Sequence, residues 1–318
     1  MKTKEIYKLL AVAFLCGSVL ITSSCKEEEA SDSIKTQYDE AYFLENLTFI
    51  LNEEGTGYEA NGTGKLLDCE HVIIPSEYNS LPVIGVDGFA HSPKLKTIDI
   101  PDSVTYLGIS AFASCSALKE ITIPGSITWL THDVFKNCKA LETVNLQEGL
   151  ESIFDDAFYG CSSLKSIVIP ETVTYIQGSV FQGCSSLETI VLPKGVYNLD
   201  DYIFEGCSSL KNITINSSSI TIGKYGFYGC SSLEKFAFTP STKTISAFIF
   251  SGCTSLKEVI IPETVTKIGY DAFASCTSLE TIYFEGSEEK WNKISIDTTN
   301  GSNGCLFEAN VIFNYVRP

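Results

Sequence analysis

A single spacing dominates this chain of 318 residues. Between Ile84 and Phe284 the same apolar residues return every 23 residues, through nine consecutive units. A period of about 20–50 residues indicates small structural units that cannot bury their apolar side alone and therefore stack on their neighbours. The period thus restricts the chain to a repeat architecture. One column of the repeat is always phenylalanine, at Phe89, Phe112, Phe135, Phe158, Phe181, Phe204, Phe227, Phe250 and Phe273.

Three further columns share this period. Leucine fills one of them in every unit, from Leu95 to Leu279, and isoleucine or leucine fills a second, from Ile84 to Ile268. Cysteine fills the third in eight units, at Cys115, Cys138, Cys161, Cys184, Cys207, Cys230, Cys253 and Cys276, while Ser92 takes its place in the first unit. Four apolar columns in a fixed register predict one interior shared by all units.

The spacing within a unit predicts its local structure. Between Leu118 and Pro124, apolar and polar residues alternate, which is typical of a strand with one buried face, and the proline ends it. The segment from Ile127 to Leu130 predicts a second short strand. Steps of three and four residues from Leu107 onward, through Cys115, indicate one face of a helical turn. We therefore predict a mainly β coil of two short strands and a helical turn, stacked nine times.

Units such as TVTYIQGSVFQGCSSLETIVLP, residues 172–193, resemble the BspA-type leucine-rich repeats of bacterial and protist surface proteins. The resemblance implies a curved leucine-rich repeat solenoid with a parallel sheet on its concave side. It also implies a binding role, since several members adhere to host matrix proteins or host cells. The proline of the repeat is replaced at Gln147, Asn216, Thr239 and Glu285, so we expect irregular turns near residues 216–219 and 239–241.

The ends of such a solenoid need closing, because an open end exposes apolar surface and unpaired strand edges. Residues 38–83 are predicted to form an N-terminal cap, residues 84–284 the solenoid, and residues 285–318 a C-terminal cap. Residues 26–37 are polar and charged, and with Cys25 they make a tether spanning residues 25–37.

The first 24 residues predict export. Lys2, Lys4 and Lys8 precede an apolar run of 13 residues, which is shorter than the roughly 20 that a membrane-spanning helix needs. The segment from Ile21 to Cys25 resembles a bacterial lipobox, which implies cleavage before Cys25 and acylation of that cysteine. Residues 1–24 are therefore predicted to be a lipoprotein signal peptide.

The residues that follow Cys25 suggest where the anchor is delivered. In the lipoproteins that this segment resembles, aspartate after the cysteine favours the inner membrane, and here the residue is Lys26. The run Lys26–Glu29 also resembles a surface-export tag, although a solvated charged tether would have the same composition. We expect a lipid-anchored protein of the outer membrane, exposed on the cell surface.

Charge and motifs exclude several function classes. There are 22 Lys and Arg against 39 Asp and Glu, a formal net charge of -17, which repels a phosphate backbone and argues against nucleic-acid partners. The three histidines share no repeat column, and nucleotide-binding, hydrolase and metalloprotease motifs are missing from the sequence. The pairs Asp155–Asp156 and Asp200–Asp201 are interpreted as helix caps. We predict no catalysis, no cofactor and no metal.

Eight cysteines at one repeat position in an exported protein leave two interpretations. Neighbouring rungs lie about 5 Å apart in such a stack, so disulfides are within reach. The side chains point in parallel, however, and pairing would tilt successive coils unequally, so we favour free, buried thiols that act as small apolar residues. Cys69 and Cys305 are placed off this column, in opposite caps.

Aromatic columns are the candidate binding residues. Aromatic side chains supply much of the contact energy at interfaces and also stack on sugars. They could equally pack over the seams between coils, in which case they would be structural. The candidates are Tyr106, Trp129 and Tyr175 in a column interrupted by Ser152, and Tyr202, Tyr225 and Phe248 in three successive coils, with Tyr270 one place away.

Together these patterns predict a monomeric, lipid-anchored surface protein that binds an extracellular protein or glycan in the manner of an adhesin. Two alternatives stay open at this stage. One is a glycan-capturing lipoprotein that serves a polysaccharide uptake system, and the other is a structural envelope protein. They differ in whether the aromatic columns are exposed, and in what they bind.

Overall fold

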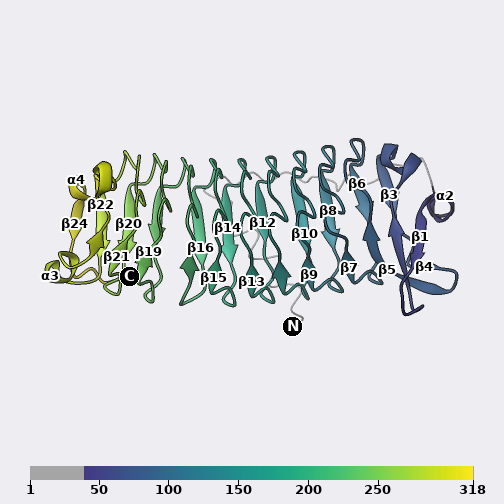
Figure 1. The fold of residues 1–318 in the computed structure, drawn as a ribbon, viewed down its shortest axis with the longest axis horizontal. Coiled ribbons are helices and arrows are strands. Elements are labelled where there is room, and N and C mark those ends of the chain that lie inside the picture. The colour runs from purple at the N-terminus through teal and green to yellow at the C-terminus, as the bar shows by residue number, and fades with distance from the viewer. Residues whose placement is uncertain (1–38, 318) are drawn as a thin grey trace, which may run out of the picture. The chain divides into compact units, whose positions relative to one another are not determined.

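Each repeat unit winds once around a shared apolar interior and lies against the next unit, in a row that runs from the purple to the yellow end of Figure 1. The computed structural model describes residues 39–317. The predicted signal peptide, Cys25 with its predicted acylation, and the predicted tether lie outside these residues. Within them, no helix is both long and apolar enough to cross a membrane.

The first strand of each coil begins two residues after the repeat leucine, and its buried residues alternate with exposed ones, as in β8. Successive strands are parallel and offset by one repeat, so that Thr143 pairs with Glu120. The strands of this row are β6 (Thr97–Asp99), β8 (Glu120–Ile123), β10 (Thr143–Leu146), β12 (Ser166–Val168), β14 (Thr189–Leu192), β16 (Asn212–Ile215), β18 (Lys235–Ala237), β20 (Glu258–Ile261) and β22 (Thr281–Phe284).

The second strand of each coil has only two residues, the second of which points into the interior. This row is also parallel, and Ser152 pairs with Trp129 on one side and with Tyr175 on the other. Its strands are β7 (Tyr106–Leu107), β9 (Trp129–Leu130), β11 (Ser152–Ile153), β13 (Tyr175–Ile176), β15 (Asn198–Leu199), β17 (Thr221–Ile222), β19 (Thr244–Ile245) and β21 (Lys267–Ile268). The predicted β-solenoid is thereby confirmed.

The segment predicted as a helical turn is a series of tight turns in the structure. Between Gly108 and Leu118, amide groups donate to carbonyls three residues earlier, as from Cys115 to Phe112. Ser110 and Ser114 have left-handed backbone, with φ of 59° and 61°. A left-handed residue breaks the run of right-handed dihedrals that a helix requires, so the turns do not merge into one.

Both strand rows lose their ladder pairing at two places, one of which falls where the sequence indicates irregular turns. This place lies between β16 and β18 in the first row and between β17 and β19 in the second. Here Asn216 and Thr239 replace the proline, and Ser219 and Thr242 replace an aliphatic residue of the preceding coils. The other interruption shared by both rows separates β6 from β8 and β7 from β9, and the first row alone is also interrupted between β10 and β12.

The nine repeat phenylalanines form one continuous stack in the interior. All of them are fully buried. Ring centroids of successive coils are 5.3–5.8 Å apart, and the planes lie within 15° of each other except at the last pair, Phe250 and Phe273. Offset-stacked rings at this separation add to the free energy gained by burial.

The cysteine column lies beside this stack, and its thiols are free in the structure, as predicted. Each thiol donates to the carbonyl oxygen of the phenylalanine 26 residues earlier, for example from Cys184 Sγ to Phe158 O at 3.2 Å. The cysteines therefore act as hydrogen-bond donors as well as small apolar residues. Burial raises the pKa of these thiols, to about 11 at Cys115 and to about 12 at Cys184.

The placement of Cys305 off this column is wrong. Its Sγ donates to Phe273 O at 3.1 Å, which is the same contact made by every other rung, and it continues the column into the C-terminal cap. The sequence separation is 32 residues instead of 26, because residues inserted in the cap lengthen this coil. Cys69 lies in the N-terminal cap, buried and free, as expected.

The N-terminal region extends both strand rows and closes that end. β3 pairs with β6, and β5 pairs with β7. Phe43, from the first helix, is fully buried there. The elements are α2 (Glu40–Asn46), β1 (Thr48–Leu51), β2 (Tyr58–Asn61), η1 (Gly64–Asp68), β3 (His71–Ile73), β4 (Glu77–Tyr78) and β5 (Leu81–Asp87).

The C-terminal region adds one further coil to the nine repeats. β23 pairs with β21, and β24 pairs with β22. The elements are α3 (Glu288–Trp291), β23 (Ser295–Ile296), η2 (Thr299–Gly301), α4 (Cys305–Glu308) and β24 (Asn310–Ile312), at the yellow end of Figure 1.

Candidate binding flank

Each coil leaves its second strand through a residue with left-handed backbone, and these residues form a column on one flank of the solenoid. In most coils the residue is serine or aspartate, which are small or bond locally to the backbone. In three coils it is a bulky aromatic residue, although left-handed backbone costs a non-glycine residue about 1–3 kcal/mol. The column is Ser110, Asp133, Asp156, Ser179, Tyr202, Tyr225, Phe248 and Asp271.

The three aromatic residues of this column, Tyr202, Tyr225 and Phe248, stack on one another and are named here the aromatic ridge. The ring centroids are 4.9 and 4.6 Å apart, and the planes lie within 10° of each other. Tyr202 is 38% exposed, and the other two are half-buried. The second group of sequence candidates is thus brought together on the surface.

Two more tyrosines extend the ridge. Tyr270, which the sequence places one position away, meets Phe248 edge-on at 5.3 Å. Tyr228 lies 5.8 Å from Tyr225 and is 40% exposed. Tyr228 was not among the sequence candidates, because its column holds only one other aromatic residue, Tyr159, among polar and small residues. The ridge therefore offers a larger aromatic surface than its three repeat positions suggest.

The first group of candidates, Tyr106, Trp129 and Tyr175, is not brought together, because no ring contact joins these residues in the part of the chain that the structure describes. Tyr106 is half-buried against Gly85 and donates to Glu59 Oε2 at 2.9 Å. Burial and this hydrogen bond raise the pKa of Tyr106 to about 12. Trp129 is 44% exposed and stands apart.

An open hollow of about 620 Å³ adjoins the ridge, lined by Asp155, Asp156, Asp200, Asp201 and Tyr202 and named here the acidic hollow. Its lining also includes Gly178 and Ser179, which occupy the column positions of Asp155 and Asp156 in the next coil. Since a glycine and a serine stand where the coils on both sides carry larger side chains, the flank is hollowed at that coil.

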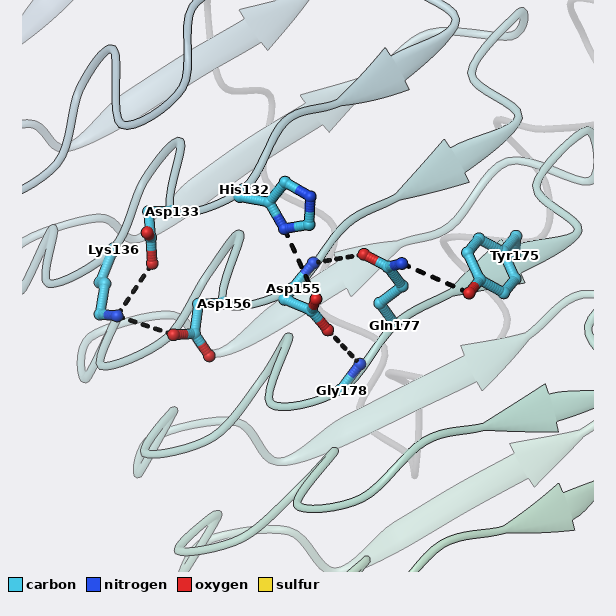
Figure 2. Close-up of polar contacts among 8 residues, drawn as sticks. All are labelled: His132, Asp133, Lys136, Asp155, Asp156, Tyr175, Gln177 and Gly178. Carbon is cyan, nitrogen blue, oxygen red and sulfur yellow. Dashed lines mark hydrogen bonds and ion pairs between the residues drawn. The ribbon is translucent and has the colours of Figure 1, made fainter.

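Polar contacts fix the N-terminal wall of the acidic hollow, as Figure 2 shows. Asp155 Oδ1 accepts from the Gly178 amide at 2.9 Å, and Asp155 Oδ2 lies 3.5 Å from His132 Nδ1. Lys136 Nζ bridges Asp133 and Asp156, at 2.8 and 2.7 Å, and these hydrogen bonds raise the pKa of Lys136. The charge of Asp156 is thereby compensated.

The C-terminal wall differs, because its carboxylates lack a cation. Asp201 Oδ1 accepts from the Lys224 amide at 2.6 Å, and Asp200 accepts from the Asn198 side chain. Within residues 39–317, neither aspartate forms an ion pair. The expected caps exist in a different form, since Asp155 and Asp201 cap backbone amides of the adjacent coil and no helix is involved.

Carboxylates hold a metal ion when several of them converge on one point. Among the residues that the structure describes, no group of three or more histidine, cysteine, aspartate or glutamate side chains could hold a metal ion. The acidic hollow is instead lined by separate carboxylates and one aromatic ring.

The fold is a leucine-rich repeat β-solenoid, and one of its flanks carries the aromatic ridge and the acidic hollow. A family model described as "BspA type Leucine rich repeat region", with six copies, matches residues 82–208 and 179–300. The chain therefore belongs to the BspA-type leucine-rich repeat family. Membership suggests a protein-binding role at the cell surface, and proteins of this kind are typically non-catalytic.

Solved structures resemble this chain along most of its length. A leucine-rich repeat protein from Bacteroides ovatus is 25% identical, with a TM-score of 0.50, and the match covers 84% of this chain and 89% of that one. The T. pallidum leucine-rich repeat protein is 24% identical, with a TM-score of 0.45 and coverage of 74% and 88%. A leucine-rich cell surface protein from Faecalibacterium prausnitzii is 24% identical, with a TM-score of 0.37 and coverage of 84% and 99%. A search of curated proteins found no match.

Proposed function

We propose that this protein is a lipid-anchored, non-catalytic binding protein of the outer-membrane surface, and that it recognises an extracellular protein through the aromatic ridge. One observation carries the proposal: Tyr202, Tyr225 and Phe248 stand half-exposed on left-handed backbone. Strained backbone persists where the surrounding structure holds it, and it often marks functional sites. The anchor rests on the sequence pattern at Cys25.

The stacking geometry favours a protein partner over a glycan. Sugars contact the flat faces of aromatic rings, yet Tyr225 is covered on both faces by Tyr202 and Phe248. The ridge mainly presents ring edges and hydroxyl groups, with one outer face at Tyr202. Tyrosine clusters of this kind are typical anchors of protein interfaces.

Binding to panels of purified matrix proteins and of glycans tests the proposed partner. We expect the mature chain to capture at least one matrix protein, and the double variant Tyr202→Ser/Tyr225→Ser to weaken that binding at least about tenfold, since aromatic anchors carry much of the energy at interfaces. Serine already fills the equivalent positions Ser110 and Ser179. The matched control is Tyr197→Thr, at a tyrosine that is 62% exposed elsewhere on the solenoid.

The alternatives give distinct results in the same assay. Capture of glycans alone, lost in the double variant, would favour the glycan-capturing lipoprotein. If neither panel binds, the structural envelope protein is favoured. Binding that survives the double variant would contradict the role assigned to the ridge.

The anchor and the location have their own test. We expect Cys25→Ala to release the protein from membrane fractions and to abolish incorporation of labelled fatty acid. Protease treatment of intact cells is expected to remove the solenoid. Unchanged membrane association of the variant would refute lipidation, and full protection of intact cells would refute surface exposure.

A further inference from the structure

Tyr202, at the N-terminal end of the aromatic ridge, has one ring face that no other ring covers among the residues that the structure describes. Tyr202 stacks on Tyr225 with one face, at an interplanar angle of 10°. Its other face points along the row of coils toward the preceding coil, where the equivalent residue is Ser179. Both Tyr202 and Ser179 line the acidic hollow. The hollow therefore has an aromatic face as one of its walls.

All the charged side chains that line the acidic hollow beside this ring face are carboxylates. Asp155, Asp156, Asp200 and Asp201 line it, and the lining contains no lysine or arginine. Lys136 compensates Asp156, and His132 lies near Asp155, whereas neither Asp200 nor Asp201 forms an ion pair within the described part of the chain. An aromatic face beside uncompensated carboxylates attracts a cation, because the ring quadrupole and the carboxylates act in the same direction.

The ridge continues this surface away from the hollow. Tyr225 and Phe248 carry the stack over two more coils, and Glu205 lies close enough to Tyr225 to interact with it electrostatically. Burial raises the pKa of the Glu205 carboxyl. The aromatic ridge is an apolar strip that ends at the acidic hollow. Its chemistry is complementary to a peptide segment in which apolar residues are followed by a basic side chain. The charge of the whole chain, -17, agrees with a basic partner.

We propose that the ridge and the acidic hollow bind a basic segment of the partner protein, with an arginine or lysine side chain seated in the hollow against the outer face of Tyr202. Arginine fits best, because its planar guanidinium group stacks on an aromatic ring and bonds to carboxylates at the same time. This inference rests on the proposed function, and it names the chemistry of the partner segment. A metal ion is a poorer occupant, since the carboxylates do not converge.

The test uses a defined probe and the full mature chain. Titration calorimetry at low salt compares the peptide Ac-Gly-Arg-Gly-Arg-Gly-NH2 with the same peptide carrying citrulline, the uncharged analogue of arginine. We expect measurable binding of the arginine peptide alone, weakened by salt because surface charges are screened. If the citrulline peptide binds as well, or if neither binds, the proposal is overturned.

Variants locate the binding. Tyr202→Ser is expected to weaken the arginine peptide about fivefold, while Tyr202→Phe keeps the ring face and stays near wild type. The double variant Asp200→Asn/Asp201→Asn is expected to weaken it about tenfold. Its matched control is Glu53→Gln/Glu54→Gln, which removes the same charge at two exposed residues of the N-terminal cap.

Equal losses in the aspartate variant and in its glutamate control would show that the peptide responds only to overall charge, and would contradict the proposal. Unaltered binding by Tyr202→Ser would do the same. Melting temperatures of all variants, measured in parallel, separate lost binding from lost folding.

The failure of this inference and the failure of the proposed function are distinguishable. A matrix protein that binds wild type and Asp200→Asn/Asp201→Asn equally, but is lost in Tyr202→Ser/Tyr225→Ser, would overturn the basic-segment proposal and leave the proposed function intact. Loss in both variants supports both. Capture that neither variant alters overturns both.

Discussion

Two aromatic stacks run along this solenoid, one inside and one on its flank. The inner stack has nine phenylalanines, all fully buried, with centroids 5.3–5.8 Å apart. The outer stack, the aromatic ridge, has three rings only 4.6–4.9 Å apart, and Tyr202 at its end is 38% exposed. The inner residues have ordinary backbone, whereas the outer ones are left-handed.

The difference separates what holds the coils together from what the flank adds. The inner rings repeat in every coil because each coil must bury the same face against its neighbours. The outer rings occur in three of the described coils. In other coils the equivalent left-handed position is filled by small or polar residues such as Ser179 and Asp156, so the fold does not require an aromatic ring there. Stability should therefore depend on the inner stack, and recognition on the outer one.

The largest effect is expected from alkaline pH, which acts on the thiols beside the inner stack. Burial raises the pKa of these thiols above the unfolded value near 9, to about 11 at Cys115 and about 12 at Cys184. The unfolded chain therefore loses protons first, so this stability is fully present below pH 9 and is lost as pH rises toward 11–12.

Each buried thiol is expected to lower the free energy of unfolding by up to about 1.4 kcal/mol per pH unit in that window, and eight of them together by up to about 11 kcal/mol per pH unit. Urea unfolding measured from pH 8 to pH 10.5 checks this slope. The control, Cys184→Val, removes one thiol and should reduce the pH dependence of the free energy of unfolding by about one eighth. A flat profile across this range would mean that folding does not raise the pKa of these thiols.

Removing one ring of the inner stack is expected to have the next largest effect on stability. Phe158→Ala should lower the free energy of unfolding by about 3–5 kcal/mol, because it leaves a cavity among fully buried rings. Urea unfolding followed by circular dichroism measures it. Tyr197→Thr is the matched surface control and should stay within about 0.5 kcal/mol of wild type. A loss below about 1 kcal/mol at Phe158 would argue against a tightly shared interior.

Removing one thiol donor should have a smaller effect. Cys184→Val keeps an apolar side chain but loses the bond to Phe158 O, which still accepts from the Cys161 amide. We therefore expect a loss of about 1 kcal/mol in the free energy of unfolding at pH 7. Cys184→Ser keeps a donor at this position and provides the comparison; in the first coil, Ser92 donates to Phe89 O of its own coil. Equal stability of wild type and both variants would mean that the thiol bonds contribute nothing.

The smallest change in stability is expected on the ridge. Tyr225→Ser loses ring stacking worth about 0.5–1.5 kcal/mol but relieves the strain of an aromatic residue on left-handed backbone. The two effects oppose each other, so the free energy of unfolding should change by less than about 1 kcal/mol. A loss as large as that of Phe158→Ala would make the ridge structural and would remove the contrast between the two stacks.

The inner stack could be read from the sequence, because a column such as Phe158 repeats every 23 residues and its physical cause, burial between like coils, is the same each time. The cysteine column was predicted for the same reason. Cys305 was missed because an insertion in the C-terminal cap moves it out of the period while its contact with Phe273 is preserved. A fixed repeat spacing cannot identify the equivalent residue once an insertion has changed the spacing.

The flank could be predicted only in part. The alignment of Tyr202 with Tyr225 follows from the period, but their left-handed backbone does not, since tyrosine rarely adopts it. The acidic hollow was not predicted, because it forms where Gly178 and Ser179 have small side chains or none. A search of the sequence for reactive or binding side chains does not detect a position where a large side chain is missing. Departures from the repeat, more than the repeat itself, mark the candidate site.

Hydrogen–deuterium exchange of the mature chain, free and bound to a matrix protein that it captures, tests most directly whether the flank is the binding surface. We predict that binding slows exchange in residues 198–206, 221–229 and 244–252, which carry the aromatic ridge and the wall of the acidic hollow. Slowed exchange confined to the first strand row, at residues 120–123, 143–146 and 166–168, would contradict the account.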